Sequence, residues 1–262
     1  MSLQDIMIDP QHLRTSQYAN DAQLRKRIVI HQLFSTNSQS WYHWLFDQIE
    51  FPRQPRILEV GCGAGTFWSE NRHRLPSGMC LSLTDLSAGM LDSARSTLDG
   101  IPITCCVADV QSLPFADGSF NLVIANHMLY HVPDIAGALR EVRRVLVPGG
   151  RCIASTNGIE HMRELLELSG KSGADRPVMS HFSLENGARK LEAEFPAVER
   201  RDFANDLEIT DVQPVIDYLE STATGDKLSP GTLEQARAVV ASAIARNGHF
   251  RVHKATGLFI AR

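Results

Sequence analysis

Short apolar runs alternate with longer amphipathic stretches through the middle of the chain. An apolar run of four to eight residues is typical of a buried strand, and apolar positions three or four residues apart are typical of a helix. Strands that alternate with helices predict an α/β fold with a mostly parallel sheet. The predicted strands cover residues 56–60, 79–84, 103–108, 122–126 and 151–155.

Capping residues mark the ends of two predicted helices in this region. Ser87 precedes a helix that we expect to run to residue 98, and Asp134 precedes one that we expect to run to residue 146. Ser and Asp side chains accept hydrogen bonds from the free N–H groups at a helix start. The run Pro148-Gly149-Gly150 is expected to end the second helix sharply.

The chain on either side of this alternating region has a different pattern. The first 50 residues hold many aromatic side chains and become periodic after Asp21, which predicts two or three helices before the first strand. The last run, 250–261, predicts one or two closing strand pieces with Gly257 as a β-bulge. We expect further helices at 159–169, 183–195, 211–221 and 229–246, and a strand at 198–203.

Length and composition narrow the class of protein. The 262 residues suffice for one elaborated α/β domain or for one domain plus a lid. The net charge of −4 comes without a basic surplus, so no nucleic-acid partner is expected. The five cysteines form no C-x-x-C pair, and we interpret them as reduced, mostly buried thiols. Neither a signal peptide nor a membrane-length apolar run is visible, so we expect a soluble, cytoplasmic protein with no membrane partner.

A glycine-rich turn follows the first predicted strand. Gly61, Gly63 and Gly65 alternate directly after the acidic Glu59. Glycine lets the backbone turn sharply and approach a ligand closely, because no Cβ intrudes. A turn of this kind between a strand and a helix is typical of a nucleotide-binding edge of an α/β sheet. The spacing is G-x-G-x-G, which differs from the G-x-G-x-x-G of dinucleotide-binding proteins.

Polar side chains end the next three strands. Asp85 follows the second strand about 20 residues after the glycines, where a carboxylate can accept hydrogen bonds from both hydroxyls of a ribose. Asp109 and Val110 end the third strand, and a carboxylate there can accept from an adenine amino group. Asn126 ends the fourth strand, where its amide and the neighbouring carbonyls can hold an amino group. Each feature alone is weak, and their order and spacing together form a strong pattern.

These segments resemble the S-adenosylmethionine-dependent methyltransferases with a Rossmann-like fold, and in particular the ubiquinone/menaquinone-biosynthesis type of small-molecule methyltransferase. The matching stretches are ILEVGCGAGTFW, LTDLSAGML, ADVQSLPFADGSFNLVIANHMLYHVPD and LREVRRVLVPGG. The resemblance covers about 100 residues from Arg56 to Asn157 and is specific for the cofactor. It implies a seven-stranded, mostly parallel sheet with helices on both faces and an antiparallel C-terminal strand.

The resemblance also implies the cofactor, S-adenosylmethionine, and the residues that hold it. Leu86 or Met90 packs on the adenine in this interpretation, and Tyr18 belongs to a lid over the cofactor. The candidate cofactor residues are Tyr18, Glu59, Gly61, Gly63, Asp85, Leu86, Met90, Asp109, Val110 and Asn126.

Three histidines lie near the expected cleft and are candidates for a catalytic base. His127 and His131 follow the fourth strand, and His161 follows the fifth. A pKa near ~6.5 makes imidazole a usable base at neutral pH. The alternative is that His131 belongs to the framework and that His161 is a solvated residue on a helix. His127 and His131 also have the i, i+4 spacing of metal ligands, but no third ligand follows nearby, so no metal site is expected.

The aromatic N-terminal segment has two interpretations. As core, Trp41, Trp44 and Phe46 pack helices onto the sheet. As a lid, one of four polar aromatic residues closes over the methyl group: Tyr18, His31, Tyr42 or His43. The expected layout is therefore a helical lid segment at 1–50 and a methyltransferase domain at 51–262, with an acceptor-side insertion at about 158–230.

The pattern as a whole, with the resemblance, predicts an enzyme that transfers a methyl group from S-adenosylmethionine to an O, N or C centre of a small molecule. Secondary metabolism is the setting that we expect for it. One alternative is a non-catalytic S-adenosylmethionine-binding regulatory protein. A nicotinamide-dependent oxidoreductase is the other, and the glycine spacing argues against it. We expect a small-molecule acceptor as partner and a monomer or homodimer.

Overall fold

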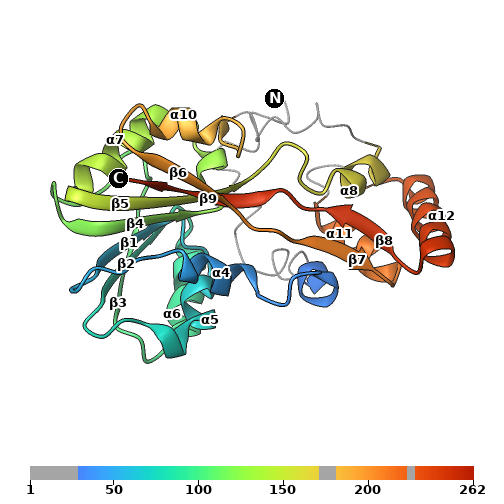
Figure 1. The fold of residues 1–262 in the computed structure, drawn as a ribbon. Coiled ribbons are helices and arrows are strands. Elements are labelled where there is room, and N and C mark those ends of the chain that lie inside the picture. The colour runs from blue at the N-terminus through green and yellow to red at the C-terminus, as the bar shows by residue number, and fades with distance from the viewer. Residues whose placement is uncertain (1–28, 171–180, 223–227) are drawn as a thin grey trace.

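The computed structural model describes residues 29–170, 181–222 and 228–262. A sheet of seven strands runs through the larger part of the molecule in the order β3-β2-β1-β4-β5-β9-β6 (Figure 1). β1 to β5 pair in parallel, and β9 runs antiparallel to both of its neighbours. The strands are β1 (Arg56–Val60), β2 (Cys80–Asp85), β3 (Ile103–Val107), β4 (Phe120–Asn126), β5 (Leu146–Asn157), β6 (Val198–Asp202) and β9 (Thr256–Ala261).

Helices cover both faces of this sheet because its strands are apolar on both sides. In β4, Val123 and Ala125 join one buried cluster, whereas Leu122 and Ile124 join the other. The first cluster includes residues of α7 (Ile135–Val145) and α10 (Gly187–Leu191). The second includes residues of α4 (Trp41–Asp47), α5 (Thr66–Glu70) and α6 (Ala88–Thr97). The predicted fold class is confirmed.

The two predicted caps are present. Ser87 Oγ accepts a hydrogen bond from Met90 N at 3.2 Å at the start of α6. Asp134 Oδ1 accepts one from Gly137 N at 2.9 Å at the start of α7. The second helix ends at Val145 with Leu146 as its C-cap, within one residue of the prediction, but Pro148-Gly149-Gly150 does not end it, because β5 begins at once. Pro148-Gly149-Gly150 lies inside β5, where the register with β4 shifts and the extra residues are accommodated.

Three further predictions need correction. Gly257 is not a bulge, since it pairs in register with Thr156 and Asp202. A Cβ at this position would lie 2.6 Å from Arg201 O, so close approach of the strands explains the glycine. The predicted helix at 159–169 starts only at Arg163, because Met162 has a left-handed φ of 54°. Likewise, the helix predicted at 183–195 is limited to α10.

A smaller lobe extends from one end of the sheet (Figure 1). We define the small lobe as residues 29–34, 159–170, 206–222 and 228–253. It contains an antiparallel pair of strands, β7 (Asp206–Ile209) and β8 (Phe250–His253). A buried cluster of its own unites these strands with the helical residues 29–34 and with three helices. These helices are α8 (Arg163–Leu168), α11 (Gln213–Thr222) and α12 (Pro230–Asn247). Two short 3-10 helices, η2 (Arg72–Arg74) and η3 (Leu129–His131), complete the elements discussed below.

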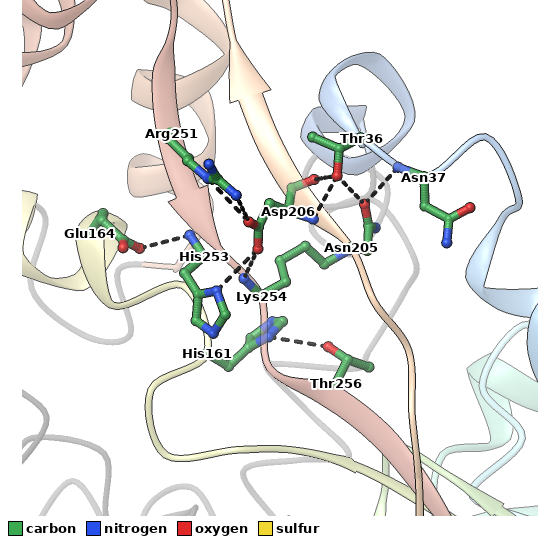
Figure 2. A network of polar contacts seen from close by, with 10 residues as sticks. All are labelled: Thr36, Asn37, His161, Glu164, Asn205, Asp206, Arg251, His253, Lys254 and Thr256. Atoms are coloured by element: carbon green, nitrogen blue, oxygen red, sulfur yellow. Dashed lines mark hydrogen bonds and ion pairs between the residues drawn. The ribbon is translucent and has the colours of Figure 1, made fainter.

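Asp206 ties the small lobe to the junction between β8 and β9 (Figure 2). Its carboxylate accepts hydrogen bonds from Arg251 Nη2 at 2.7 Å and from the backbone N of Lys254 at 3.1 Å. The backbone of Asp206 pairs with Thr36, whose N–H donates to Asp206 O at 3.0 Å. Asn205 Oδ1 accepts from Asn37 N at 3.1 Å. These bonds fix the segment after the first described helix against the strands of the small lobe.

Candidate functional site

The glycine turn directly follows β1. The strand order of the sheet reverses at β1, because β2 and β3 lie on one side of it and β4 and β5 lie on the other. Gly61, Gly63 and Gly65 have left-handed φ values of 64°, 54° and 75°. A Cβ on Gly61 would lie 2.8 Å from Met128 Cβ, and one on Gly65 would lie 2.9 Å from Leu98 Cδ1. A Cβ on Gly63 would meet no atom within 4 Å. The turn is therefore packed at both ends and open at its centre, which is the arrangement that a ligand needs.

Glu59 is the buried acid of β1 that precedes this turn. Its carboxylate accepts a hydrogen bond from Trp68 Nε1 at 2.6 Å, and the residue is 1% exposed. Burial raises the pKa of Glu59 to about 8, because a charged carboxylate loses its hydration in the core. Its expected contribution to the cofactor site is thus indirect, through the position of the glycine turn.

Asp85 faces the open centre of the turn. Its Oδ2 accepts from Gly63 N at 2.9 Å, and its Oδ1 accepts from Ser87 N at 2.8 Å. Burial raises its pKa, although hydrogen bonds from the backbone N–H groups of Ser87, Gly63 and Leu86 favour the charged form. The carboxylate keeps acceptor capacity for a ligand hydroxyl. The next residue, Leu86, is half-buried, and Met90 in α6 is 1% exposed.

Asp109 lies two residues after the end of β3, beside the end of β2, which carries Asp85. Ala108 N donates to Asp85 O at 3.1 Å, which connects the ends of the two strands. The Asp109 carboxylate accepts from Gln111 N at 2.9 Å and from Gln111 Nε2 at 3.0 Å. Val110 is 5% exposed and belongs to the core. The two acids thus lie along one edge of the sheet, in the order that the sequence predicts.

Asn126 closes the opposite side of this edge. Its Oδ1 accepts from Ser155 Oγ at 2.6 Å and from Trp41 Nε1 at 3.3 Å. Trp41 was predicted as plain core, and this interpretation is incomplete, because its ring is only half-buried and its N–H reaches the strand end. The described part of the N-terminal segment therefore contacts the candidate site.

His127 follows Asn126 with an unusual backbone. Its φ of 53° lies in the left-handed region, which is strained for a residue with a Cβ and recurs at functional sites. Its ring packs against Trp41 with centroids 5.0 Å apart. Burial and the charge of Lys254 lower its pKa to about 4, so the imidazole is neutral at pH 7. Its shielded Nδ1 has no hydrogen-bond partner among the described residues.

The other two candidate histidines occupy different surroundings. His131 ends η3, and its ring packs on Tyr130 with centroids 4.6 Å apart. His161 precedes α8, and its Nδ1 lies 3.2 Å from Thr256 Oγ1 (Figure 2). The structure therefore does not unite the three candidates in one constellation. It instead brings His127 near His31 and Lys254, and the charge of Lys254 lowers the pKa of both imidazoles.

Sequence reasoning missed Lys254 and the polar role of Trp41. Lys254 separates two strands and has no motif around it, so its approach to β4 depends on the tertiary fold alone. His31 was one of four residues considered for the lid, without a signal that singled it out. Tyr18, the preferred lid residue, lies outside the described residues.

The described residues include neither a membrane-spanning helix nor a candidate metal site. In the parts of the chain that the structure describes, no helix has the length and hydropathy needed to cross a membrane. Within the same ranges, no group of three or more His, Cys, Asp or Glu side chains has the arrangement of a metal site.

The comparison with protein families assigns the central part of the chain. Residues 58–154 match the family described as "Methyltransferase domain". A malonyl-[acyl-carrier protein] O-methyltransferase of Hahella chejuensis is 38% identical over 132 residues, which are 50% of this chain and 47% of that protein. A ubiquinone/menaquinone biosynthesis C-methyltransferase of Desulfotalea psychrophila is 32% identical over 115 residues, covering 44% of this chain and 46% of that protein. The chain thus spans about half the length of these curated relatives.

The comparison with solved structures concerns the fold. A protein of Anabaena variabilis, described as a putative methyltransferase from an antibiotic biosynthesis pathway, superimposes with a TM-score of 0.62. The two sequences are 14% identical, and the match covers 84% of this chain and 96% of that one. At this identity the likeness establishes the fold alone.

Proposed function

The chain contains a domain of the methyltransferase family in residues 58–154, and from this premise we propose that the protein transfers a methyl group from S-adenosylmethionine to an O, N or C centre of a small molecule. A role in secondary metabolism, a cytoplasmic location and a monomeric or homodimeric state remain predictions from the sequence.

One observation carries this proposal: the open centre of the glycine turn lies beside the Asp85 carboxylate. Gly63 leaves room for a ligand against the backbone, and the Asp85 carboxylate has acceptor capacity left for a ligand hydroxyl. Asp109 is available to the adenine amino group on the next strand end. The backbone carbonyls beside Asn126 are available to the amino group of the methionine part, while Asn126 Oδ1 already accepts from Ser155 Oγ and Trp41 Nε1. The residues therefore fit the adenosyl and methionine parts of S-adenosylmethionine.

Leu86, Met90 and Val110 complete the adenine pocket in this proposal. The half-buried Leu86 offers apolar surface to a flat aromatic ring, and Met90 and Val110, which are 1% and 5% exposed, contribute as core residues of this region. Glu59 acts below the turn through its hydrogen bond to Trp68. Gly61 allows Met128 to pack directly on the turn, so the loop after β4 lies next to the bound ligand.

The bound cofactor supplies a methyl group that is already activated on a sulfonium. The protein's own task is to align the acceptor at near-attack distance and to exclude water. An acceptor hydroxyl or protonated nitrogen must also lose a proton. His127 is the best-supported candidate for this step, because it is neutral, adjacent to Asn126 and has a free Nδ1 among the described residues. His131 and His161 remain weaker candidates.

We also propose that residues 1–50 form a lid and that the acceptor pocket is built with the insertion at about 158–230. The contact of Trp41 with Asn126 supports a position of the first segment at the cofactor edge. A participation of Tyr18 remains a prediction.

Cofactor binding and turnover test the proposal in sequence. A ligand that prefers the folded state raises the melting temperature, so S-adenosylhomocysteine should stabilise the protein and NAD should not. Equal shifts from both compounds would contradict the proposal. Release of S-adenosylhomocysteine from S-adenosylmethionine in the presence of a panel of acceptors then separates an enzyme from a regulatory binding protein.

A further inference from the structure

Three nitrogen-bearing side chains meet where the sheet, the small lobe and the N-terminal segment converge. His31 comes from the helical residues 29–34, His127 from the end of β4, and Lys254 from the junction of β8 and β9. Burial lowers the pKa of both histidines, and the charge of Lys254, joined at His31 by that of His127, lowers it further, so the three groups lie near enough to interact electrostatically. No motif in the sequence connects these residues.

The surrounding scaffold fixes each of the three. The ring of His127 packs in a tilted arrangement against Trp41, whose Nε1 donates to Asn126 Oδ1. The segment after His31 is tied to β7, since Thr36 N donates to Asp206 O at 3.0 Å. The backbone N of Lys254 donates to Asp206 Oδ1 at 3.1 Å. The cluster is therefore held in place at the boundary between the sheet and the small lobe.

The polar groups of the cluster are only partly compensated. Burial lowers the pKa of Lys254 to about 8, and the charge of Asp206 opposes this shift. The Asp206 carboxylate is already bonded to Arg251 and His253, at 2.7 Å and 3.1 Å, and Figure 2 shows the Lys254 side chain running away from these two residues. Lys254 is half-buried, and its ammonium forms no hydrogen bond or ion pair with the described residues. The shielded Nδ1 atoms of His31 and His127 also have no hydrogen-bond partner in the described ranges. Groups left in this state cost free energy unless a ligand satisfies them.

The chemistry of the three groups selects the ligand. An ammonium and two neutral imidazoles can all donate hydrogen bonds, and the positive charge attracts an anion and repels a metal cation. Next to them, the ring of Trp41 offers a flat apolar surface. His127 directly follows Asn126, so an anion held here lies beside the proposed site of the methionine part of the cofactor. A carboxylate has the charge and the acceptor atoms for this arrangement.

We propose that His31, His127 and Lys254 form the acceptor subsite and bind a carboxylate group of the acceptor. The inference rests on the proposed function and deepens it, because it assigns the acceptor to the carboxylic acids. In this arrangement His127 Nδ1 carries the proton and donates to the carboxylate, so His127 is a binding residue and not the base. It leaves open which atom of that acid receives the methyl group.

The experiment uses the full chain saturated with S-adenosylhomocysteine and two probes of the same shape, benzoate and neutral benzamide. Imidazole signals of His31 and His127, assigned with His31→Gln and His127→Gln, are followed by NMR during each titration. Benzoate should shift both signals and benzamide should not. Lys254→Met should weaken benzoate binding at least about tenfold, because a charge-assisted contact is lost. Lys254→Arg should restore most of it, and Lys190→Met on α10 is the matched control that should change nothing.

Three outcomes overturn the inference. The first is an absence of any shift of His31 and His127 with benzoate in the wild-type protein. The second is equal binding of benzamide, or of inorganic phosphate in preference to benzoate. The third is a tenfold loss of S-adenosylhomocysteine affinity in Lys254→Met, which would assign the cluster to the carboxylate of the cofactor. If the wild-type protein fails to bind S-adenosylhomocysteine at all, the proposed function itself fails, so the two failures are distinguishable.

Discussion

Two regions of the molecule differ in how the fold assembles them. The cofactor edge consists of the glycine turn with Asp85, Asp109 and Asn126, and the acceptor cluster consists of His31, His127 and Lys254. At the cofactor edge, Gly63 and Asp85 are 22 residues apart and meet because consecutive strands pair in parallel. Around the acceptor cluster, Thr36 and Asp206 are 170 residues apart and meet only after the small lobe has packed against the sheet. A site made from neighbouring strand ends leaves a pattern in the sequence, whereas a site made from distant segments leaves almost none. The same difference predicts that the two sites respond separately to mutation.

The largest expected effect is on the pH dependence of the unfolding free energy, and it comes from Glu59, the buried acid that precedes the glycine turn. The pKa of Glu59 rises from 4.5 to about 8 on folding, so the folded state holds a proton that the unfolded state releases. The stability that this group contributes is complete below pH 4.5 and is lost as the pH rises toward 8. The slope is up to about 1.4 kcal/mol per pH unit in that window. Glu59→Gln should flatten it in urea unfolding measured between pH 5 and 8.

The exposed Glu192→Gln is the control for this measurement and should keep the wild-type slope. The absolute stability of Glu59→Gln does not decide the question, since the amide also changes the hydrogen bonding below the turn. An unchanged slope in Glu59→Gln would show that another group is responsible.

The next effect distinguishes two glycines of the same turn. Gly61→Ala adds a Cβ against Met128 and forces a left-handed φ, which should destabilise the protein by about 2–4 kcal/mol. Gly63→Ala has only the backbone strain, about 1–2 kcal/mol, because its Cβ enters open space. Denaturant unfolding should therefore rank Gly61→Ala as the less stable, whereas calorimetry should find that Gly63→Ala still loses S-adenosylhomocysteine binding. Full binding by Gly63→Ala would mean that the ligand does not approach the centre of the turn.

A smaller effect is expected at the ligand contacts themselves. Asp85→Ala removes hydrogen bonds to a charged group, each of which contributes about 1.5–3 kcal/mol. The affinity for S-adenosylhomocysteine should fall at least about tenfold in a calorimetric titration. Asp109→Ala should act in the same direction but more weakly, because apolar packing also holds the adenine. Asp92→Ala, on the exposed face of α6, should bind normally. An Asp85→Ala variant with wild-type affinity would remove this residue from the site.

The same contrast explains which features the sequence predicts. The glycine turn, Asp85, Asp109 and Asn126 were identified because each directly follows a strand, and parallel strands bring their carboxyl ends to one edge. Trp41 was misjudged because an aromatic residue in an amphipathic helix has the same pattern whether its N–H is satisfied by solvent or by a strand end.

The remaining errors have a similar origin. The run Pro148-Gly149-Gly150 is typical of a helix end, and only the pairing of Phe120 with Leu146 makes it part of a strand. Gly257 is typical of a bulge, and only the approach of Arg201 O explains it as a regular strand residue. Lys254 follows a short strand like many surface lysines, and its burial is decided by residues far away in the chain. Local chemistry was therefore predictable, and contacts between distant segments were not.

The smallest expected effect tests whether the acceptor side is independent of the cofactor edge. Asn205 is 9% exposed and fixes the segment after the first described helix: its Oδ1 accepts from Asn37 N at 3.1 Å, and its Nδ2 donates to Ser35 Oγ at 3.1 Å. Asn205→Ala removes these two bonds and the longer one from Thr36 Oγ1 at 3.4 Å, and should cost about 1–2 kcal/mol of unfolding free energy. The position of His31 should become less defined, so benzoate binding should weaken, while S-adenosylhomocysteine affinity stays within about twofold. Asn186→Ala, at the start of α10 on the opposite face of the sheet, is the control that should spare both ligands. Equal losses for both ligands in Asn205→Ala would show that the two sites form one cooperative unit, because the Trp41–Asn126 contact would then transmit the disturbance across the edge.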